Sequence, residues 1–225
     1  MPQVTFQSAG ARLAGTLTLP PGPGPHPVVV LLHGASWGLR AFYDAYVEAF
    51  LEAGVGTFAF DRRGEGESEG SAKQDIFAFE ADAEAAFAHL QTLPGVDSAR
   101  VGLWGYSNGA WVATLAASRL PDCAFLVLTG AAGVSPGASE AFRRSEDLRA
   151  QGISEATLDA VRATWLIVFD YLAHGEWRPD WDHELARCRA VIAADVALVE
   201  RNDLKASAVR LCLGHQQTVG IVSTL

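Results

Sequence analysis

Residues 105–109 combine a serine with two glycines in the order Gly-Tyr-Ser-Asn-Gly. A serine hydroxyl can attack a carbonyl carbon, and the G-x-S-x-G spacing is typical of a serine held on a sharp turn between a strand and a helix. The glycines suit such a turn, because side chains there would collide with the backbone around Ser107. The amide of Asn108 would open the helix and could bind negative charge. The pattern predicts Ser107 as a nucleophile, although an ordinary glycine-rich turn has the same spacing.

Strands and helices alternate around this turn through the first half of the chain. Apolar runs predict strands at 28–32, 55–60, 101–104 and 124–128. Helical periodicity predicts helices at 41–53, 76–90 and 110–117. Ahead of them, an alternating pattern around Ala9-Gly10 predicts an N-terminal β-hairpin. Repeated βα units imply a parallel sheet with helices on both faces, and ligands of such sheets bind beyond the carboxyl ends of the strands. Ser107 falls at that edge.

The pattern changes twice along the chain. Residues 1–134 carry the α/β core described above. Residues 135–204 lose the strand-like runs, show helical periodicity and contain three tryptophans, which predicts a helical insertion. Residues 205–225 begin with a short strand-like run and predict a return to the core.

Composition excludes several classes of function. The chain has 225 residues, of which 49% are hydrophobic, so a sizeable core is available. A net charge of -9 argues against nucleic acid as a partner. The sequence shows no apolar run long enough to cross a membrane and no leader, so we expect no membrane span and a cytoplasmic location. No cluster of His, Cys and Asp has metal-ligand spacing, so no cofactor or metal is expected. The oligomeric state is left open.

Three motifs then appear in a fixed order, each after a predicted strand. They are His-Gly at 33–34, Asp-Arg-Arg-Gly-Glu-Gly-Glu-Ser at 61–68, and the serine turn at 105–109. The motif at 61–68 is similar to a D-x-R-G-x-G-x-S signature. Together the motifs resemble the α/β-hydrolase superfamily, most closely its serine esterases, lysophospholipase-like enzymes and proline-iminopeptidase-like peptidases. The resemblance implies an α/β fold with a doubly wound, mostly parallel sheet, an N-terminal β-hairpin and a helical lid.

The resemblance also implies roles for single residues. Ser107 would be the nucleophile, and the backbone amides of Asn108 and Ala35 would form the oxyanion hole. His33 would brace the loop that follows it, and the loop that begins at Asp61 would be mostly structural. The residues that would line the substrate site are Gly34, Ser36 and Tyr106.

The C-terminal residues depart from the family pattern. The order in this fold is Ser, then an acid, then His. The context of the acid reads Gly-His-Gln-Gln at 214–217, with Gln217 where a carboxylate is expected. His215 is the candidate base, at a position that the family gives to another residue. We therefore expect an α/β-hydrolase without its last strand and helix, through truncation, a shifted reading frame or natural shortening.

The leading hypothesis is an enzyme, a serine hydrolase that cleaves a carboxylic ester or related acyl bond of a small molecule through an acyl-Ser107 intermediate. One alternative is an acyl or prolyl peptidase or a thioesterase of the same fold. Another is a catalytically inactive relative that binds a small apolar ligand under the lid. Reaction of Ser107 with a fluorophosphonate would separate the enzyme from the binding protein.

Overall fold

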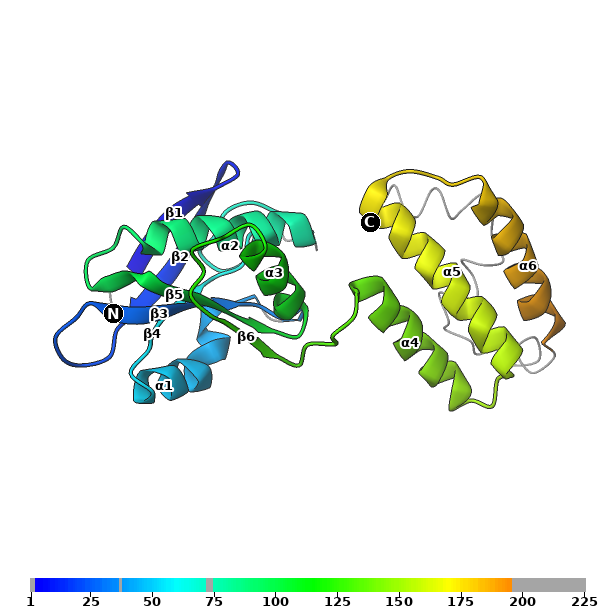
Figure 1. Cartoon of the computed structure of the whole chain (residues 1–225), viewed down its shortest axis with the longest axis horizontal. Coiled ribbons are helices and arrows are strands. Elements are labelled where there is room, and N and C mark those ends of the chain that lie inside the picture. Colours follow the sequence, from blue (N-terminus) through cyan, green and yellow to red (C-terminus); the bar gives the residue numbers. More distant parts are fainter. Residues whose placement is uncertain (1–2, 37, 72–74, 196–225) are drawn as a thin grey trace. The chain divides into compact units, whose positions relative to one another are not determined.

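The computed structural model describes residues 3–36, 38–71 and 75–195. The chain forms two compact units, which divide between Ala132 and Gly133. The first unit contains a sheet with its helices, and the second is helical in its described part (Figure 1). The function of the second unit as a lid stays a prediction. The predicted return to the core at 205–225 lies outside the described residues.

The first unit is built on a six-stranded sheet with the order β1-β2-β4-β3-β5-β6. Its strands are β1 (Gln3–Ser8), β2 (Ala11–Thr18), β3 (His26–Leu32), β4 (Gly56–Phe60), β5 (Val96–Tyr106) and β6 (Leu126–Thr129). Strands β1 and β2 form the predicted hairpin, whose turn places both Ala9 and Gly10 at positive φ, as a two-residue hairpin requires. Strand β2 pairs antiparallel with β4, and β4, β3, β5 and β6 are parallel to one another. This arrangement confirms the mostly parallel sheet.

Helices cover both faces of this sheet. They are α1 (Asp44–Glu52), which follows the 3-10 turn η1 (Arg40–Tyr43), then α2 (Ile76–Leu90) and α3 (Asn108–Ala117). Helices α2 and α3 lie on one face and α1 on the other (Figure 1). In β3, Val28 and Val30 pack in the core under α2 and α3, whereas Val29 and Leu31 pack on the side of α1. Because both faces are covered, this strand is apolar at every position from 28 to 32.

The predicted helices differ in how well their residues match the structure. Helix α2 spans the predicted range, and the carboxylate of Asp75 caps it by accepting from the amides of Phe77 and Ala78. The predicted helix at 41–53 was wrong in its first turn, which is the 3-10 turn η1. A 3-10 turn has three residues per turn, so it shifts the buried face. Tyr43 is therefore the buried residue there, while Phe42 is 50% exposed.

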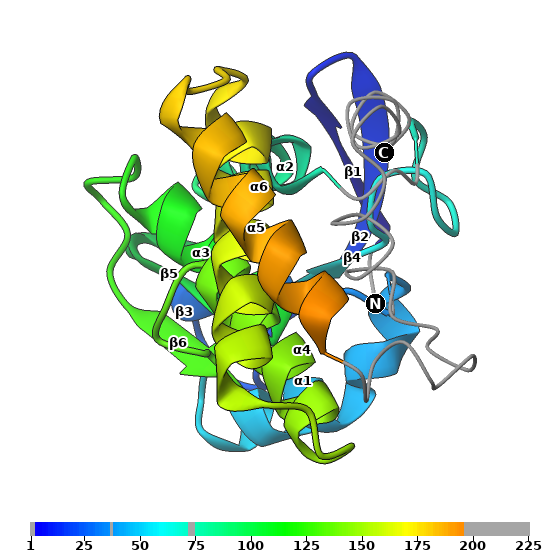
Figure 2. The same cartoon turned by 90° about the vertical axis from the view of Figure 1, so that its right-hand side faces the viewer.

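The second unit consists, in its described part, of three helices. They are α4 (Pro136–Arg149), α5 (Glu155–His174) and α6 (Asp180–Ala194). Helix α5 packs against both of the others, as Figures 1 and 2 show from two sides. Ser135 caps α4, Ser154 caps α5, and Gly175 ends α5 in the left-handed conformation. Among the described residues, no helix combines the length and the apolar character needed to cross a membrane.

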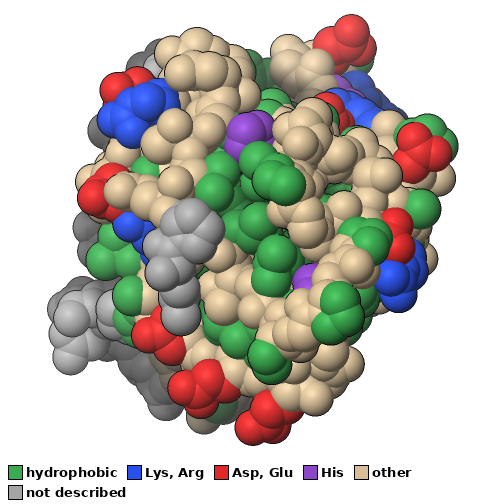
Figure 3. Space-filling model, turned by 90° about the vertical axis from the view of Figure 1, so that its left-hand side faces the viewer, with side chains coloured by type: hydrophobic (Ala, Val, Ile, Leu, Met, Phe, Trp, Pro, Cys, Tyr) green, Lys and Arg blue, Asp and Glu red, His purple; other side chains and the backbone are tan. Residues whose placement is uncertain are grey.

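Charged side chains of both signs are distributed over the surface. On the face drawn in Figure 3, apolar side chains gather in the middle, and acidic and basic side chains lie mostly toward the rim. Many of the arginines pair with nearby carboxylates, such as Arg143 with Glu140 and Arg187 with Glu184. These two pairs place acidic and basic side chains side by side on helices α4 and α6 of the second unit.

Candidate active site

Ser107 lies at the tip of the turn between β5 and α3, at the carboxyl end of its strand. Its φ of 52° and ψ of -114° lie in a region that residues with a side chain rarely adopt. The amide of Ser107 donates to the carbonyl oxygen of Thr129 at 2.8 Å, which ties the turn to β6. The side chain is exposed, so the sharp turn presents the hydroxyl to solvent.

At both glycines of the motif, another stretch of backbone lies too close to leave room for a side chain. A Cβ on Gly105 would overlap the carbonyl oxygen of Gly109 and lie 2.7 Å from the Cα of Ala110. A Cβ on Gly109 would overlap the carbonyl oxygen of Leu32 and lie 2.7 Å from that of His33. Real Cβ atoms do not make such contacts, so the glycines let α3 start directly against β3 and β5. The predicted geometric role of both glycines is confirmed.

The candidate oxyanion donors come from two adjacent loops. Asn108 is the first residue of α3, and the first amides of a helix have no acceptor within the helix. They also lie at the positive end of the helix dipole. Gly34 is buried directly after β3, and Ala35 and Ser36 follow it on the surface. The approach of Gly109 to His33 brings this loop against the serine turn. The structure therefore places the two segments that carry the predicted donors next to each other.

Tyr106 begins an aromatic group beside Ser107. Its ring stacks on Trp104 with 6.2 Å between ring centroids, and Tyr46 lies 4.6 Å from Trp104 and 6.4 Å from Tyr106. The indole N–H of Trp104 donates to the hydroxyl of Thr129. Tyr106 is 39% exposed, so one aromatic surface is open next to Ser107.

Asp61 is fully engaged in holding its own loop. One carboxylate oxygen accepts from the backbone amide of Arg40 at 2.9 Å, and the other accepts from the amide of Glu67 at 3.0 Å and pairs with the Arg40 guanidinium. The residue is 4% exposed. These contacts are those of a group that fixes a loop, and they leave little capacity for proton transfer.

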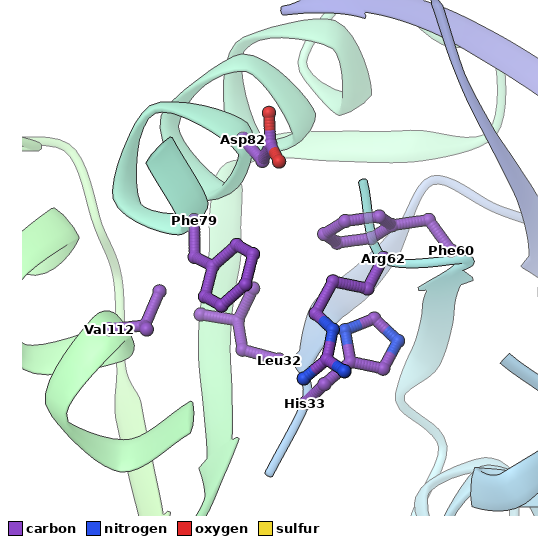
Figure 4. Close-up of a pocket in the computed structure, with 7 residues that line it drawn as sticks. All are labelled: Leu32, His33, Phe60, Arg62, Phe79, Asp82 and Val112. Carbon is purple, nitrogen blue, oxygen red and sulfur yellow. The ribbon is translucent and has the colours of Figure 1, made fainter. Parts of the chain in front are cut away.

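His33 is buried at the start of the loop that follows β3 and carries the candidate donor Ala35. It lines a cavity of about 20 Å³ whose other walls are Leu32, Phe60, Arg62, Phe79, Asp82 and Val112 (Figure 4). Burial and the neighbouring Arg62 guanidinium lower the pKa of His33 to about 4, so the imidazole is neutral at pH 7. Its ring meets those of Tyr43 and Phe60 edge-on. His33 is thus held as part of the support of the loop.

Two residues support the loop after β3: Tyr43, which was not identified from the sequence, and Arg62, which was predicted only as part of a mostly structural loop. The amide of Gly34 donates to the hydroxyl of the buried Tyr43 at 3.1 Å, and Arg62 donates to carbonyl oxygens of the same loop. The spacing of Tyr43 to Val47 and Phe50 is that of one helical face and could have indicated its burial. No local pattern indicates the contacts of Arg62, because they join residues about 27 positions apart.

The tryptophans and histidines of the second unit, and the candidate base, are placed as follows. Trp165 and Trp181 are buried in cores of the second unit, while Trp177 is 39% exposed. His174 is on α5 and His183 is on α6. The candidate base His215 and the neighbouring Gln217 lie outside the described residues. No group of three or more His, Cys, Asp or Glu side chains in the described part of the chain could hold a metal ion.

Comparison with known families agrees with this geometry. The family described as serine aminopeptidase, S33, matches residues 23–180. The match includes the loop after β3, the Asp61 loop and the serine turn. The chain belongs to this family and is thus a member of the α/β-hydrolase superfamily.

Individual relatives match a shorter stretch. The chain is 33% identical over 108 residues to the quorum-quenching protein AidA of Acinetobacter baumannii, which covers 47% of this chain and 36% of AidA. It is 32% identical over 103 residues to the thiohydrolase apmlB of Arthrinium phaeospermum, which covers 45% of this chain and 34% of that protein. The matched segment thus spans little more than a third of the length of these curated relatives.

A solved structure supports the fold. The esterase PF2001 of Pyrococcus furiosus superposes with a TM-score of 0.55 over 67% of this chain and 55% of the esterase, at 23% sequence identity. At this identity the likeness concerns the fold alone. The α/β-hydrolase fold predicted from the motifs is therefore confirmed.

Proposed function

We propose that this protein is a serine hydrolase that cleaves a carboxylic ester or a related acyl bond through an acyl-Ser107 intermediate. The observation that carries the proposal is the exposed Ser107 at a φ of 52°, on a turn that only glycines can close at 105 and 109. Such a conformation costs about 1–3 kcal/mol and persists only where the surroundings impose it. It presents the hydroxyl beside the amide that opens α3, as acyl transfer requires.

The first half-reaction forms the acyl-enzyme. The Oγ of Ser107 bonds to the carbonyl carbon of the substrate while a base takes the hydroxyl proton, and the carbonyl oxygen becomes an oxyanion. The amides of Asn108 and Ala35 donate to this oxygen; in other enzymes one such donor is worth about 3 kcal/mol. The carbonyl then re-forms, the alkoxide or thiolate leaves with the proton from the base, and the acyl group stays on Ser107.

The second half-reaction releases the acid. Water attacks the acyl carbon, the base takes a proton from the water, and the same amides hold the second oxyanion. The Ser107 oxygen leaves with that proton, which restores the hydroxyl. The complete cycle therefore starts and ends with the neutral serine hydroxyl, and water is the one co-substrate.

The proposed mechanism also needs a general base that accepts the proton of Ser107. His33 is a poor base at neutral pH, because its pKa is about 4 and a general base works best near the operating pH. His215 remains the candidate from the sequence. Comparing His215→Gln with His183→Gln tests it, since a base at 215 predicts a loss of turnover in the first variant alone.

The names of relatives support an oxygen or sulfur ester as the bond that is cleaved. One relative is named a thiohydrolase and another an esterase, whereas the family description names a serine aminopeptidase. All three reactions use the same acyl-serine chemistry and differ in the leaving atom. A panel of oxygen esters, thioesters and amino-acyl amides that share one acyl group separates them.

The direct test is reaction with a fluorophosphonate probe. We expect the wild-type protein to gain the mass of one probe molecule and Ser107→Ala to gain none. Ser118→Ala is a matched control, because Ser118 is another exposed serine at the other end of α3. A folded wild-type protein that neither reacts with the probe nor hydrolyses any member of the panel would contradict the proposal and favour a binding protein.

A further inference from the structure

The side chain of Arg62 reaches under the loop that carries the candidate oxyanion donor. Its Nη1 donates to the carbonyl oxygen of Gly34 at 3.0 Å and to that of Ala35 at 3.1 Å. Its backbone amide donates to the carbonyl oxygen of Gly38 at 2.7 Å. One residue therefore holds the loop at both ends. Arg62 is 6% exposed, so these bonds are shielded from water.

Because the peptide bond is planar, these hydrogen bonds to the carbonyl oxygens also set the direction of the N–H groups that follow them. In a trans peptide the C=O of one residue and the N–H of the next point in opposite directions. Holding the Gly34 oxygen toward Arg62 therefore turns the Ala35 N–H away from Arg62, and holding the Ala35 oxygen turns the Ser36 N–H in the same way. A positive charge on the carbonyl side also polarises the peptide and strengthens its N–H as a donor.

Other residues fix the guanidinium in turn. Nε and Nη2 of Arg62 donate to the same carboxylate oxygen of Glu65, with Nε at 2.9 Å. The guanidinium lies over the ring of Phe79, 5.3 Å from its centroid. Figure 4 shows it between that ring and the imidazole of His33. Contacts with the loop carbonyl oxygens, with Glu65 and with the ring of Phe79 therefore fix the position of the Arg62 guanidinium. A side chain without a planar head that carries several donors could not make all of these contacts at once.

We propose that Arg62 is a positioning residue, whose guanidinium orients the Ala35 amide for the oxyanion that forms on the substrate carbonyl. The inference rests on the proposed function, because an oxyanion exists only if Ser107 performs acyl transfer. Arg62 acts through the loop and does not itself contact the substrate. Its loss should weaken binding of the transition state and leave binding of the substrate almost unchanged.

Three variants of the full chain test this role. Arg62→Gln removes the charge and the fork, and Arg62→Lys keeps the charge but loses the planar fork. Arg63→Gln is the matched control, because Arg63 is the next residue and its side chain is also largely buried. Its guanidinium binds the carboxylate of Asp82 and the carbonyl and hydroxyl oxygens of Ser8, which lie outside the oxyanion loop.

The first readout is the separation of kcat from KM on the best ester of the panel. A misplacement of about 1 Å in a catalytic group can lower the rate by about 10²-fold. We expect Arg62→Gln to lower kcat by about that factor at nearly constant KM, and Arg62→Lys to recover part of it. Arg63→Gln should keep the kcat of the folded protein. Equal kcat values in Arg62→Gln and Arg63→Gln would overturn the inference.

The other readout does not depend on turnover. Hydrogen exchange of the amides at 33–38 should be faster in Arg62→Gln than in the wild type and unchanged in Arg63→Gln. If the wild-type protein has no hydrolase activity, the proposed function fails on the wild type alone, while exchange still reports whether Arg62 holds the loop. Unchanged exchange at 33–38 in Arg62→Gln would overturn the inference whatever the activity.

Discussion

Gly105 lies so close to the carbonyl group of Gly109 across the Ser107 turn that it could not carry a side chain. The Cβ of an alanine at 105 would occupy the space of the Gly109 carbonyl, and one at 109 would occupy that of Leu32 and His33. The obstacles are backbone atoms, which cannot rotate away. The turn, the first residues of α3 and the end of β3 are therefore one packed backbone assembly.

Gly109→Ala should destabilise the protein and abolish reaction at Ser107. Overpacking costs about 1–3 kcal/mol, and a clash with two carbonyl oxygens belongs at the upper end of that range. Gly102→Ala provides the contrast, because its Cβ would meet the ring of Phe125, a side chain that can turn. Urea unfolding measures both. A Gly109→Ala protein as stable as wild type would show that the two backbones lie further apart than in this structure.

Ser107→Gly should unfold at higher urea concentration than Ser107→Ala. Glycine adopts positive φ without strain, while alanine retains the strain of the serine. The relief of about 1–3 kcal/mol exceeds the extra backbone entropy that glycine loses on folding, about 0.5–1 kcal/mol, so we expect a net gain of about 1 kcal/mol. Both variants should be unreactive. Equal stability of the two would contradict strain at this position.

His33 should make the first unit sensitive to acid. Its pKa in the folded protein is about 4, below the ordinary value of 6.5, so the unfolded chain binds the proton more tightly. The contribution of His33 to the free energy of unfolding is therefore constant above pH 6.5, and it is lost progressively as the pH falls from 6.5 to 4. The difference in pKa corresponds to about 3 kcal/mol at full effect.

The measurement for His33 is the free energy of unfolding across that pH range in the wild type and in His33→Gln. The variant removes the titrating group, so its stability should fall less steeply between pH 6.5 and 4. Carboxylates titrate in both proteins, and their effect cancels in the difference. Parallel curves would show that the His33 pKa is not lowered.

Asp82→Asn should cost far more stability than Asp97→Asn. Asp82 is 2% exposed in its side chain and pairs with the largely buried Arg63, whereas the partner of Asp97, Arg100, is 56% exposed. Breaking a buried pair costs about 3–5 kcal/mol because one charge is left uncompensated, and a surface pair contributes about 0–1 kcal/mol. Thermal or urea unfolding of both variants checks the ranking. Similar losses would mean that the Arg63 pair is solvated.

Local patterns predicted the elements whose stabilising contacts are themselves local or strongly periodic. The apolar residues of α2 recur along one face, and the structure starts and ends this helix where the periodicity does. The alternation around Ala9-Gly10 identified the hairpin in the same way. The helix at 41–53 was predicted less accurately, because its first turn is a 3-10 turn, which changes which residues face the sheet.

The sequence by itself determined the order of the βα units, the sharp serine turn and the loops expected at the carboxyl edge of the sheet, because strand, helix and turn preferences act over a few residues. The tertiary structure alone decided how those loops support one another. Arg62 reaches Gly34 and Ala35, and Gly109 reaches Leu32, across long stretches of chain. Such contacts depend on sheet order and register, which bring β3 beside both β4 and β5. No local preference encodes that adjacency, so the support of the loop after β3 became visible only in the folded chain.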